Sequence, residues 1–302
     1  MELIKQNTNI DFVGKMKIAF IASTVLIAVS ILSILLHGGL NYGIDFAGGT
    51  IVQIQFKSET PTEKIRSAFK PIGLDNSIIQ QVGAQEFVVR TAESTSDTQG
   101  LSGKMSDALT ASFGKDTFEI RRVEVVGPKV GKDLTQKAVW ALLFSWLGML
   151  IYIAFRFEFR YAVGAIAALV HDTIITVGIF SLLDKEFTLT IVAALLTIIG
   201  YSINDTIVVF DRIRENVRKN PRQSIGDLLN ASINQTLSRT VLTSLTVLIV
   251  VVVLFFLGGE VIHDFAFALI VGVIVGTYSS IFIASHCVLA WERFRPAKQR
   301  KR

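Results

Sequence analysis

The sequence predicts a polytopic α-helical membrane protein with six transmembrane helices and an α+β domain of ferredoxin-like type inserted between the first and second spans. Hydrophobic residues make up 51% of the 302 residues and charged residues only 18%, against about 25% charged in a soluble domain. Six apolar stretches approach or exceed the roughly 20 residues that cross a bilayer. Residues 38–137, between the first two stretches, alternate between strand-like and helix-like patterns.

The transmembrane stretches are the most hydrophobic parts of the sequence. We expect an uncleaved anchor at the first one, because it is longer than a signal-peptide core and no small-x-small cleavage site follows it. Its residues are taken as part of a leading segment, 1–37, and the other spans lie within 138–290. The six stretches are residues 18–36, 138–155, 162–183, 187–210, 241–258 and 264–290.

Basic residues predict the orientation, because short cytoplasmic loops collect Lys and Arg. They concentrate before the first stretch, in the loops after the second and fourth stretches, and in a basic tail at 291–302. The short loops on the opposite side, 184–186 and 258–264, contain only Lys185. Both termini are therefore expected in the cytoplasm, with residues 38–137 outside. The same bias accounts for the net charge of +5 without nucleic-acid binding.

The external domain reads as β-α-β-β-α-β, the order of a ferredoxin-like sandwich. It contains no His, no Cys and no serine in a nucleophile elbow, so it is expected to bind or to act as a lever and not to catalyse a reaction. The only cysteine, Cys287, lies in an apolar stretch, so neither a metal site nor a cofactor is expected. The expected strands are 51–56, 77–82, 86–91 and 118–126, with helices beginning at Pro61 and spanning 101–113.

Two glycine-rich segments flank this domain. Neither has the spacing of a phosphate-binding loop that ends in Gly-Lys-Ser/Thr. Two roles remain open for them: tight turns that join the domain to the membrane, or hinges that let it move. The residues concerned are Gly43, Asp45, Gly48 and Gly49 before the first strand, and Gly127, Pro128 and Gly131 after the last.

Ionisable residues inside the spans are the main functional candidates. A central Asp costs about 2.5–3.5 kcal/mol on insertion scales, so such residues usually face a bundle interior or an aqueous path. Asp205 lies in the fourth stretch, and Arg239 begins the fifth at a similar depth. We expect a carboxylate whose protonation the nearby cation biases. A permanent ion pair that fastens two helices is the alternative.

Further polar residues extend this seam. Tyr201 and Asn204 precede Asp205 at helical spacing, and Thr243 lies one turn beyond Arg239. In the third stretch, His171 and Asp172 lie near the middle, where a proton relay and a structural role are both open. The loop 211–238 is amphipathic, and its apolar face from Ile225 to Leu237 predicts a helix along the membrane surface.

Six segments together resemble the SecF family of protein-export membrane proteins. The segment GYSINDTIVVFDRIREN at Gly200–Asn216 is the most specific of them. The others are Gly43–Thr50, Val126–Gly131, Arg156–Asp172, Ser238–Ser244 and Gly276–His286, so the resemblance covers most of the chain in order.

The resemblance implies a role in the bacterial inner membrane. SecF belongs to the RND superfamily and supplies one six-span half of a complex whose other half is SecD. It implies partnership with SecD, with the SecYEG channel and YajC, and with a translocating preprotein, and it implies use of the proton motive force without a hydrolytic site. The family's intramembrane Asp, its Arg and the Thr one turn beyond fall on Asp205, Arg239 and Thr243. The external domain, 38–137, would then be periplasmic.

Two other functions remain possible from the sequence. An RND-type exporter of drugs or lipids is disfavoured, because the chain holds only one six-span half and an external domain of modest size. A scaffold that only stabilises SecD and the channel predicts that neutral replacements of Asp205 and Arg239 are tolerated.

Overall fold

The computed structural model describes residues 8–75, 77–91 and 98–294, which form two compact units. The helical unit contains the chain up to Asn41, Trp140–Lys185 and the part from Thr190 onward. The α+β unit contains Tyr42–Val139 together with the short segment Glu186–Leu189. Residues 295–302 of the predicted basic tail lie outside the described part of the chain, and 291–294 end a helix.

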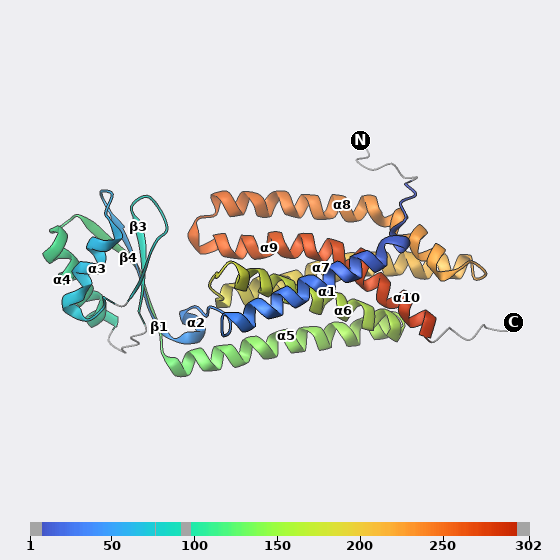
Figure 1. Ribbon diagram of the computed structural model, residues 1–302, viewed down its shortest axis with the longest axis horizontal. Coiled ribbons are helices and arrows are strands. Elements are labelled where there is room, and N and C mark those ends of the chain that lie inside the picture. Colours follow the sequence, from blue (N-terminus) through green and yellow to red (C-terminus); the bar gives the residue numbers. More distant parts are fainter. Residues whose placement is uncertain (1–7, 76, 92–97, 295–302) are drawn as a thin grey trace. The chain divides into compact units, whose positions relative to one another are not determined.

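Six helices of the described chain are long and apolar enough to cross a membrane, which confirms the predicted fold class (Figure 1). The sixth is a compound helix in which a π-helical turn, η2, joins α9 to α10. The helices are α1 (Phe12–Leu36), α5 (Pro128–Arg156), α6 (Phe159–Leu182), α7 (Leu189–Lys219), α8 (Ile225–Leu257), and α9 (Glu260–Ser279) with η2 (Ser280–Ala284) and α10 (Ser285–Phe294).

The helices run further than their apolar stretches because polar caps and polar turns extend them. The Asp11 side chain accepts a hydrogen bond from the Gly14 amide at 2.7 Å and caps α1. Ser224 caps α8 in the same way, by accepting from the Asp227 amide at 3.2 Å. Such caps satisfy amides that have no partner within the helix.

The prediction of a separate surface helix after Ser224 is wrong. The segment continues without interruption into α8. Its apolar residues Leu229, Ile233 and Leu237 are buried in the same core as Phe210 and Ile213 of α7. An apolar helical face can be covered by protein or by lipid, and the sequence pattern is the same in both cases.

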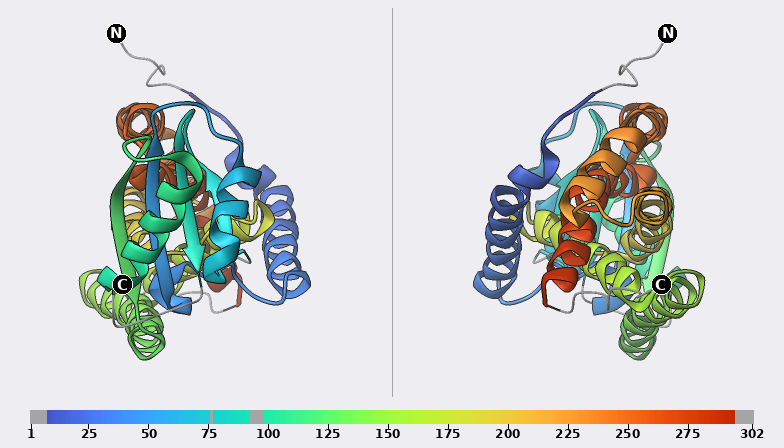
Figure 2. Two further views of the ribbon diagram at one scale, coloured as in Figure 1. Left: turned by 90° about the vertical axis from the view of Figure 1, so that its left-hand side faces the viewer. Right: turned by 90° about the vertical axis from the view of Figure 1, so that its right-hand side faces the viewer.

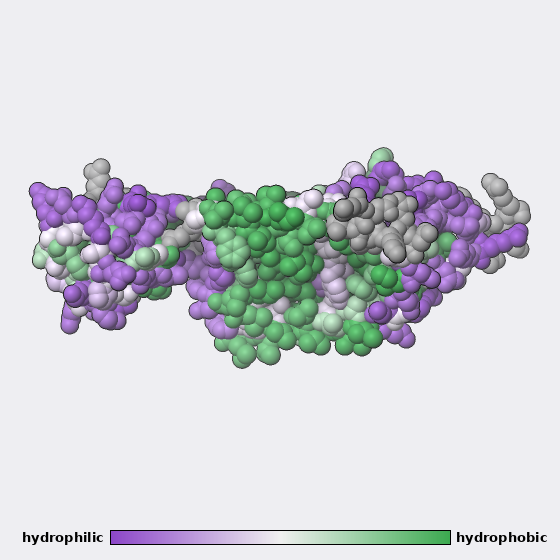
Figure 3. Space-filling model, turned by 90° about the horizontal axis from the view of Figure 1, so that it is seen from above, coloured by the Kyte–Doolittle hydropathy of each residue, from purple (hydrophilic) through white to green (hydrophobic). Residues whose placement is uncertain are grey.

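Burial divides the helices of this unit into an inner and an outer group. The most apolar parts of α6, α7 and the compound helix are more than half buried, whereas those of α1, α5 and α8 are less than a quarter buried. The exposed side chains are large and apolar, for example Leu26, Phe144 and Val250. Figure 3 shows a broad apolar band on one face of this unit, as expected for a surface in contact with lipid.

The α+β unit has the predicted ferredoxin-like topology. Its four strands form an antiparallel sheet in the order β2-β3-β1-β4, with both helices on one face (Figure 2). Alternate residues of β1, namely Val52, Ile54 and Phe56, are buried against these helices. The elements are α2 (Ile44–Ala47), β1 (Gly49–Phe56), α3 (Thr62–Phe69), η1 (Lys70–Ile72), β2 (Ile78–Gln81), β3 (Glu86–Thr91), α4 (Thr98–Phe113) and β4 (Phe118–Val126).

Candidate functional site

Asp205 lies on α7 with only 8% of its surface exposed. Both of its carboxylate oxygens accept hydrogen bonds from neighbouring helices. Thr240 of α8 donates to Oδ1 at 2.6 Å, and Ser280, the first residue of η2, donates to Oδ2 at 2.5 Å. The carboxylate is therefore held by two hydroxyl groups at the meeting point of three helices.

Arg239, the predicted partner of Asp205, is exposed. No ion pair joins the two side chains among the described residues. Successive helical residues point about 100° apart, so α8 presents Thr240 to Asp205 while Arg239 starts from a different face of the helix. The sequence analysis predicted which turn of α8 lies beside Asp205. Within that turn, the structure places Thr240 and not Arg239 in hydrogen-bond contact with the carboxylate.

The remaining predicted relay residues separate in the structure. Tyr201 donates to Ser244 of α8 at 2.9 Å, and Ser244 contacts Thr277 of α9 at 2.7 Å. Thr243, whose neighbour Ser244 makes this contact, is half-buried, and Asn204 is exposed on α7. The structure thus brings Tyr201 into a hydroxyl chain across three helices and leaves Asn204 on an open face.

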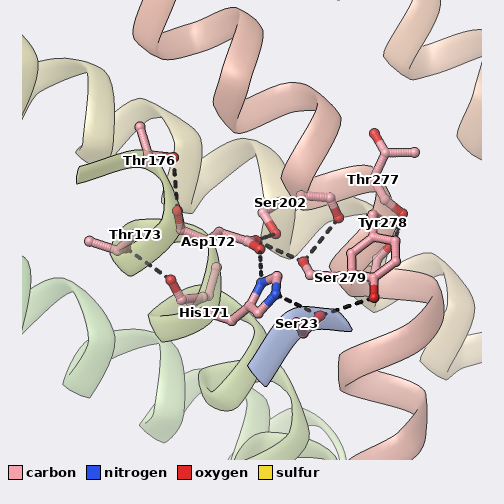
Figure 4. Close-up of polar contacts among 12 residues, drawn as sticks. Ser23, His171, Asp172, Thr173, Thr176, Ser202, Thr277, Tyr278 and Ser279 are labelled. Carbon is pink, nitrogen blue, oxygen red and sulfur yellow. Dashed lines mark hydrogen bonds and ion pairs between the residues drawn. The ribbon is translucent and has the colours of Figure 1, made fainter. Parts of the chain in front are cut away.

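His171 and Asp172 form a second polar site, enclosed by α1, α6, α7 and α9 (Figure 4). His171 is 3% exposed and Asp172 only 1%. Nδ1 of His171 lies 2.9 Å from Oδ1 of Asp172, and Nε2 lies 3.1 Å from the hydroxyl of Ser23. Ser202 and Ser279 donate to Oδ2 of Asp172 at 2.7 and 2.8 Å. The predicted relay residue Asp172 is therefore fully hydrogen-bonded within the described chain.

Sequence reasoning missed the hydroxyl residues that hold both carboxylates. They are Ser202, Thr240, Ser279 and Ser280, and Ser23 contacts His171 beside them. Ser and Thr are common in membrane helices, where many bond only to their own backbone. Their presence in a span therefore carries little signal, and only contacts between helices distinguish the ones that hold a carboxylate.

The predicted glycine segments pack closely at the base of the α+β unit. Gly49 has a φ of +131°, and a Cβ there would lie 2.5 Å from the Thr91 carbonyl oxygen. A Cβ on Gly131 would lie equally close to the carbonyl oxygen of Phe46. The chain has no room for a side chain at these positions, which explains why they are glycines. We call this close-packed region, where the two glycine segments meet, the joint. Hinge motion at this joint remains a prediction.

The other predicted joint residues lie at the same place. Gly127 accepts from the Gly131 amide at 3.0 Å across the first turn of α5, which Pro128 begins. Gly48 has a φ of +78°, and a Cβ there would lie 3.1 Å from the Cα of Pro128. Asp45 accepts a hydrogen bond from the amide of Leu189, the first residue of α7, at 2.8 Å. Asp45 thereby caps α7.

The short segment 186–189 completes this joint and was missed by the sequence reasoning. The amide of Gly43 donates to the Phe187 carbonyl at 3.0 Å, and the ring of Phe187 stacks on Phe46 with centroids 5.9 Å apart. Glu186 forms an ion pair with Arg90 of β3 at 2.8 Å. No local sequence pattern predicts these contacts, because the partners are about 100 or more residues apart in the chain.

Possible metal ligands do not cluster in the part of the chain that the structure describes. Within residues 8–75, 77–91 and 98–294, no three His, Cys, Asp or Glu side chains are placed to hold one ion. The chemistry that the two polar sites can offer is the binding and exchange of protons by carboxylate, imidazole and hydroxyl groups.

Six spans, a ferredoxin-like domain after the first span and carboxylates buried between helices define one half of an RND-like membrane protein. The family described as protein export membrane protein SecD/SecF, C-terminal, matches residues 105–294, and the SecD/SecF GG motif matches residues 33–60. The GG motif coincides with the glycine segment that leads into β1.

Relatives of known name match along the whole chain. The protein translocase subunit SecF of Magnetococcus marinus is 48% identical and covers 100% of this chain and 97% of its own. That of Calditerrivibrio nitroreducens is 50% identical, with 95% and 96% covered. The chain therefore belongs to the SecF family of protein translocase subunits.

The fold also matches solved structures. The crystal structure of SecDF from Thermus thermophilus, described as a translocon-associated membrane protein, is 41% identical, with a TM-score of 0.86 over 96% of this chain. A second SecDF structure, in a super-membrane-facing form, gives a TM-score of 0.73 at 40% identity. This chain spans 40% of the length of each SecDF chain.

Proposed function

We propose that this chain, as an accessory subunit of the Sec machinery together with a SecD partner, uses the proton motive force to promote preprotein movement across the bacterial inner membrane and release from that membrane. In this proposal both termini are cytoplasmic and the α+β domain is periplasmic. The SecYEG channel, YajC and the preprotein are further partners. Asp205 is the proton-carrying residue, and Arg239 biases its protonation.

The observation that supports this proposal is the position of Asp205. An idle carboxylate between membrane helices is costly, and this one is held by hydroxyl groups that can stabilise either protonation state. A proton that moves through about 100 mV yields about 2.3 kcal/mol. That energy changes the ratio of two conformations roughly fiftyfold, which is enough to drive a cycle.

The exposed polar face of α7 and α8 supports a partner of similar architecture. Thr197 and Asn204 of α7 and Gln235 and Arg239 of α8 are exposed in this chain. Polar groups in a membrane are stabilised by a protein neighbour or an aqueous path rather than by lipid. In transporters built from two related halves, the working site lies at the interface of the halves, and SecD would supply the second half.

Translocation into inverted vesicles tests the proposal. The vesicles carry Asp205→Asn with SecD in a strain that lacks native SecF, and translocation is measured with and without a proton gradient. Asn preserves size and most hydrogen bonding but cannot ionise, so assembly should be normal and the response to the gradient lost. Asp211→Asn, the same change at an exposed position of α7, is the matched control.

The scaffold alternative expects a different result from the same experiment. If the chain only stabilises SecD and the channel, Asp205→Asn and Asp211→Asn should both translocate like wild type. Gradient-dependent translocation by Asp205→Asn at the wild-type rate would eliminate the proton-carrying role.

A further inference from the structure

We propose that His171 and Asp172 form a second proton-binding site, which holds one shared proton and is connected to Asp205 through the adjacent serines Ser279 and Ser280. The inference rests on the proposed proton-driven function and adds a site to it. It is carried by hydrogen-bond geometry, because each hydroxyl has one proton to donate and the donors around this pair can be counted.

The count starts at Tyr278, beside His171 (Figure 4). Its hydroxyl lies 2.6 Å from the carbonyl oxygen of Ala19, which can only accept, so Tyr278 donates there. The contact between Ser23 and Tyr278, at 3.0 Å, must then be donated by Ser23. With its one proton used, Ser23 accepts from Nε2 of His171 at 3.1 Å. His171 therefore carries a proton on Nε2.

The other end of the pair is counted in the same way. Ser202 donates to Oδ2 of Asp172 at 2.7 Å, and Ser279 shares its proton between Oδ2 at 2.8 Å and the Gly276 carbonyl at 3.1 Å. Oδ2 is an acceptor in this arrangement and carries no proton. Nδ1 of His171 lies 2.9 Å from Oδ1 of Asp172, and two bare lone pairs at that distance would repel. One proton must lie between them. The pair then holds two protons and is neutral overall, whether as imidazolium and carboxylate or as imidazole and carboxylic acid.

Loss of the shared proton would have a structural consequence. The imidazole would then keep a single proton, which is most stable on Nδ1 facing the Asp172 carboxylate, and Nε2 would become an acceptor. Ser23 of α1 would have to donate to Nε2 of His171 and give up its donation to Tyr278. The protonation of the pair is therefore coupled to the packing of α1 against α6.

Ser279 and Ser280 connect this pair to Asp205. Ser279 ends α9 and donates to Asp172, whereas Ser280 begins η2 and donates to Asp205. Single π-helical turns inside α-helices frequently lie at functional sites. A change of hydrogen bonding at one serine alters the backbone that carries the other, so the two carboxylates are coupled through this π-turn.

Among the described residues, the other ionisable groups near the pair are Tyr278 and Asp205. On α9, the Tyr278 ring stacks on His171 with centroids 6.1 Å apart. On α7, Asp205 lies three residues beyond Ser202, about one helical turn. On α1, the described contact is Ser23. The expected coupling of proton binding is therefore between Asp172, His171 and Asp205.

The test measures gradient-driven translocation as a function of pH, in vesicles that carry the complex with SecD. His171→Gln keeps a donor for Ser23 but cannot bind an additional proton, and Asp172→Asn cannot ionise. Both variants should assemble, lose about tenfold of the gradient-driven rate, the factor expected for one charge-assisted hydrogen bond, and show an altered pH profile. Thr173→Val removes a buried hydroxyl of the same helix whose described hydrogen bond is to the Leu169 carbonyl of its own turn, so it should keep the wild-type profile.

Two results would overturn the inference. One is a wild-type pH profile in both His171→Gln and Asp172→Asn. The other is an equal change in Thr173→Val, which would indicate a merely structural role. The Asp205→Asn variant in the same assay separates the proposals: if it loses the gradient response while His171→Gln keeps its profile, only the second site is rejected.

Nitrogen-labelled histidine provides a measurement on the wild-type complex, in case the variants fail to assemble. The chain has four histidines, and each reports its protonation in the nitrogen resonances. We expect the His171 resonances to change as pH is varied, and to change again in Asp205→Asn. Resonances of His171 that stay constant in both would contradict the coupled site.

Discussion

Asp172 and Asp205 are two buried carboxylates that accept hydrogen bonds from adjacent residues, Ser279 and Ser280 respectively. Their other surroundings differ. Asp172 has a cationic or neutral imidazole and two serines as partners, all enclosed by helices of this chain. Among the described residues Asp205 has two hydroxyl donors, and the cation next to Thr240 on the same turn of α8, Arg239, is exposed. The comparison indicates one site completed within the chain beside a second that, in the proposed function, faces the partner.

The largest expected effect is a difference in stability between variants of Asp172 and variants of Asp205. Asp172→Leu removes the acceptor for His171, Ser202 and Ser279 inside a closed site, and breaking such a buried charged pair costs about 3–5 kcal/mol. Asp205→Leu should cost only about 1–2 kcal/mol, because Ser280 also contacts the Thr277 carbonyl at 3.0 Å. Thermal unfolding of the two purified complexes should rank Asp172→Leu well below Asp205→Leu. The reverse order would break the comparison.

Arg239→Met tests the Asp205 site by removing the cation near it. Arg239 is exposed, so its replacement should change the free energy of unfolding by less than about 0.5 kcal/mol. Without the cation, the carboxylate of Asp205 is biased toward its protonated form. Gradient-driven translocation should therefore fall at least about tenfold, while Arg239→Lys retains part of the activity. A large loss of stability in Arg239→Met would indicate that the arginine packs within the chain.

Two glycines provide the smallest and most local test. A Cβ on Gly276 would lie 3.1 Å from the Cβ of Ser202 and 3.6 Å from Oδ2 of Asp172, whereas one on Gly200 meets nothing within 4 Å. Gly276→Ala should cost about 1 kcal/mol through crowding at the closed site. Gly200→Ala should be neutral or slightly stabilising, because alanine favours the helix. Equal stability of the two variants would mean that the residues around Asp172 move apart at little cost.

Periodicity explains which elements could be predicted. The strand at 118–126 was predicted with the bounds of β4, because alternation with period two is a local property. The first transmembrane helix begins at Phe12, six residues before its apolar stretch, because polar helical turns carry no hydropathy signal. The amphipathic segment after Ser224 was misplaced for a related reason: its pattern identifies an apolar face but not what covers it.

What the sequence by itself determined was the fold class, the six spans, the order of the external domain and the intramembrane residues Asp172, Asp205 and Arg239. These follow from local hydropathy and from the cost of an ionisable group in a membrane. Only the tertiary structure decided that Thr240 and Ser280 hold Asp205, that His171 pairs with Asp172, and that segment 186–189 joins the glycine segments. The reason is rotation: a helix that turns by one residue exchanges the side chain presented to its neighbour, and that angle is set by the packing of the whole bundle.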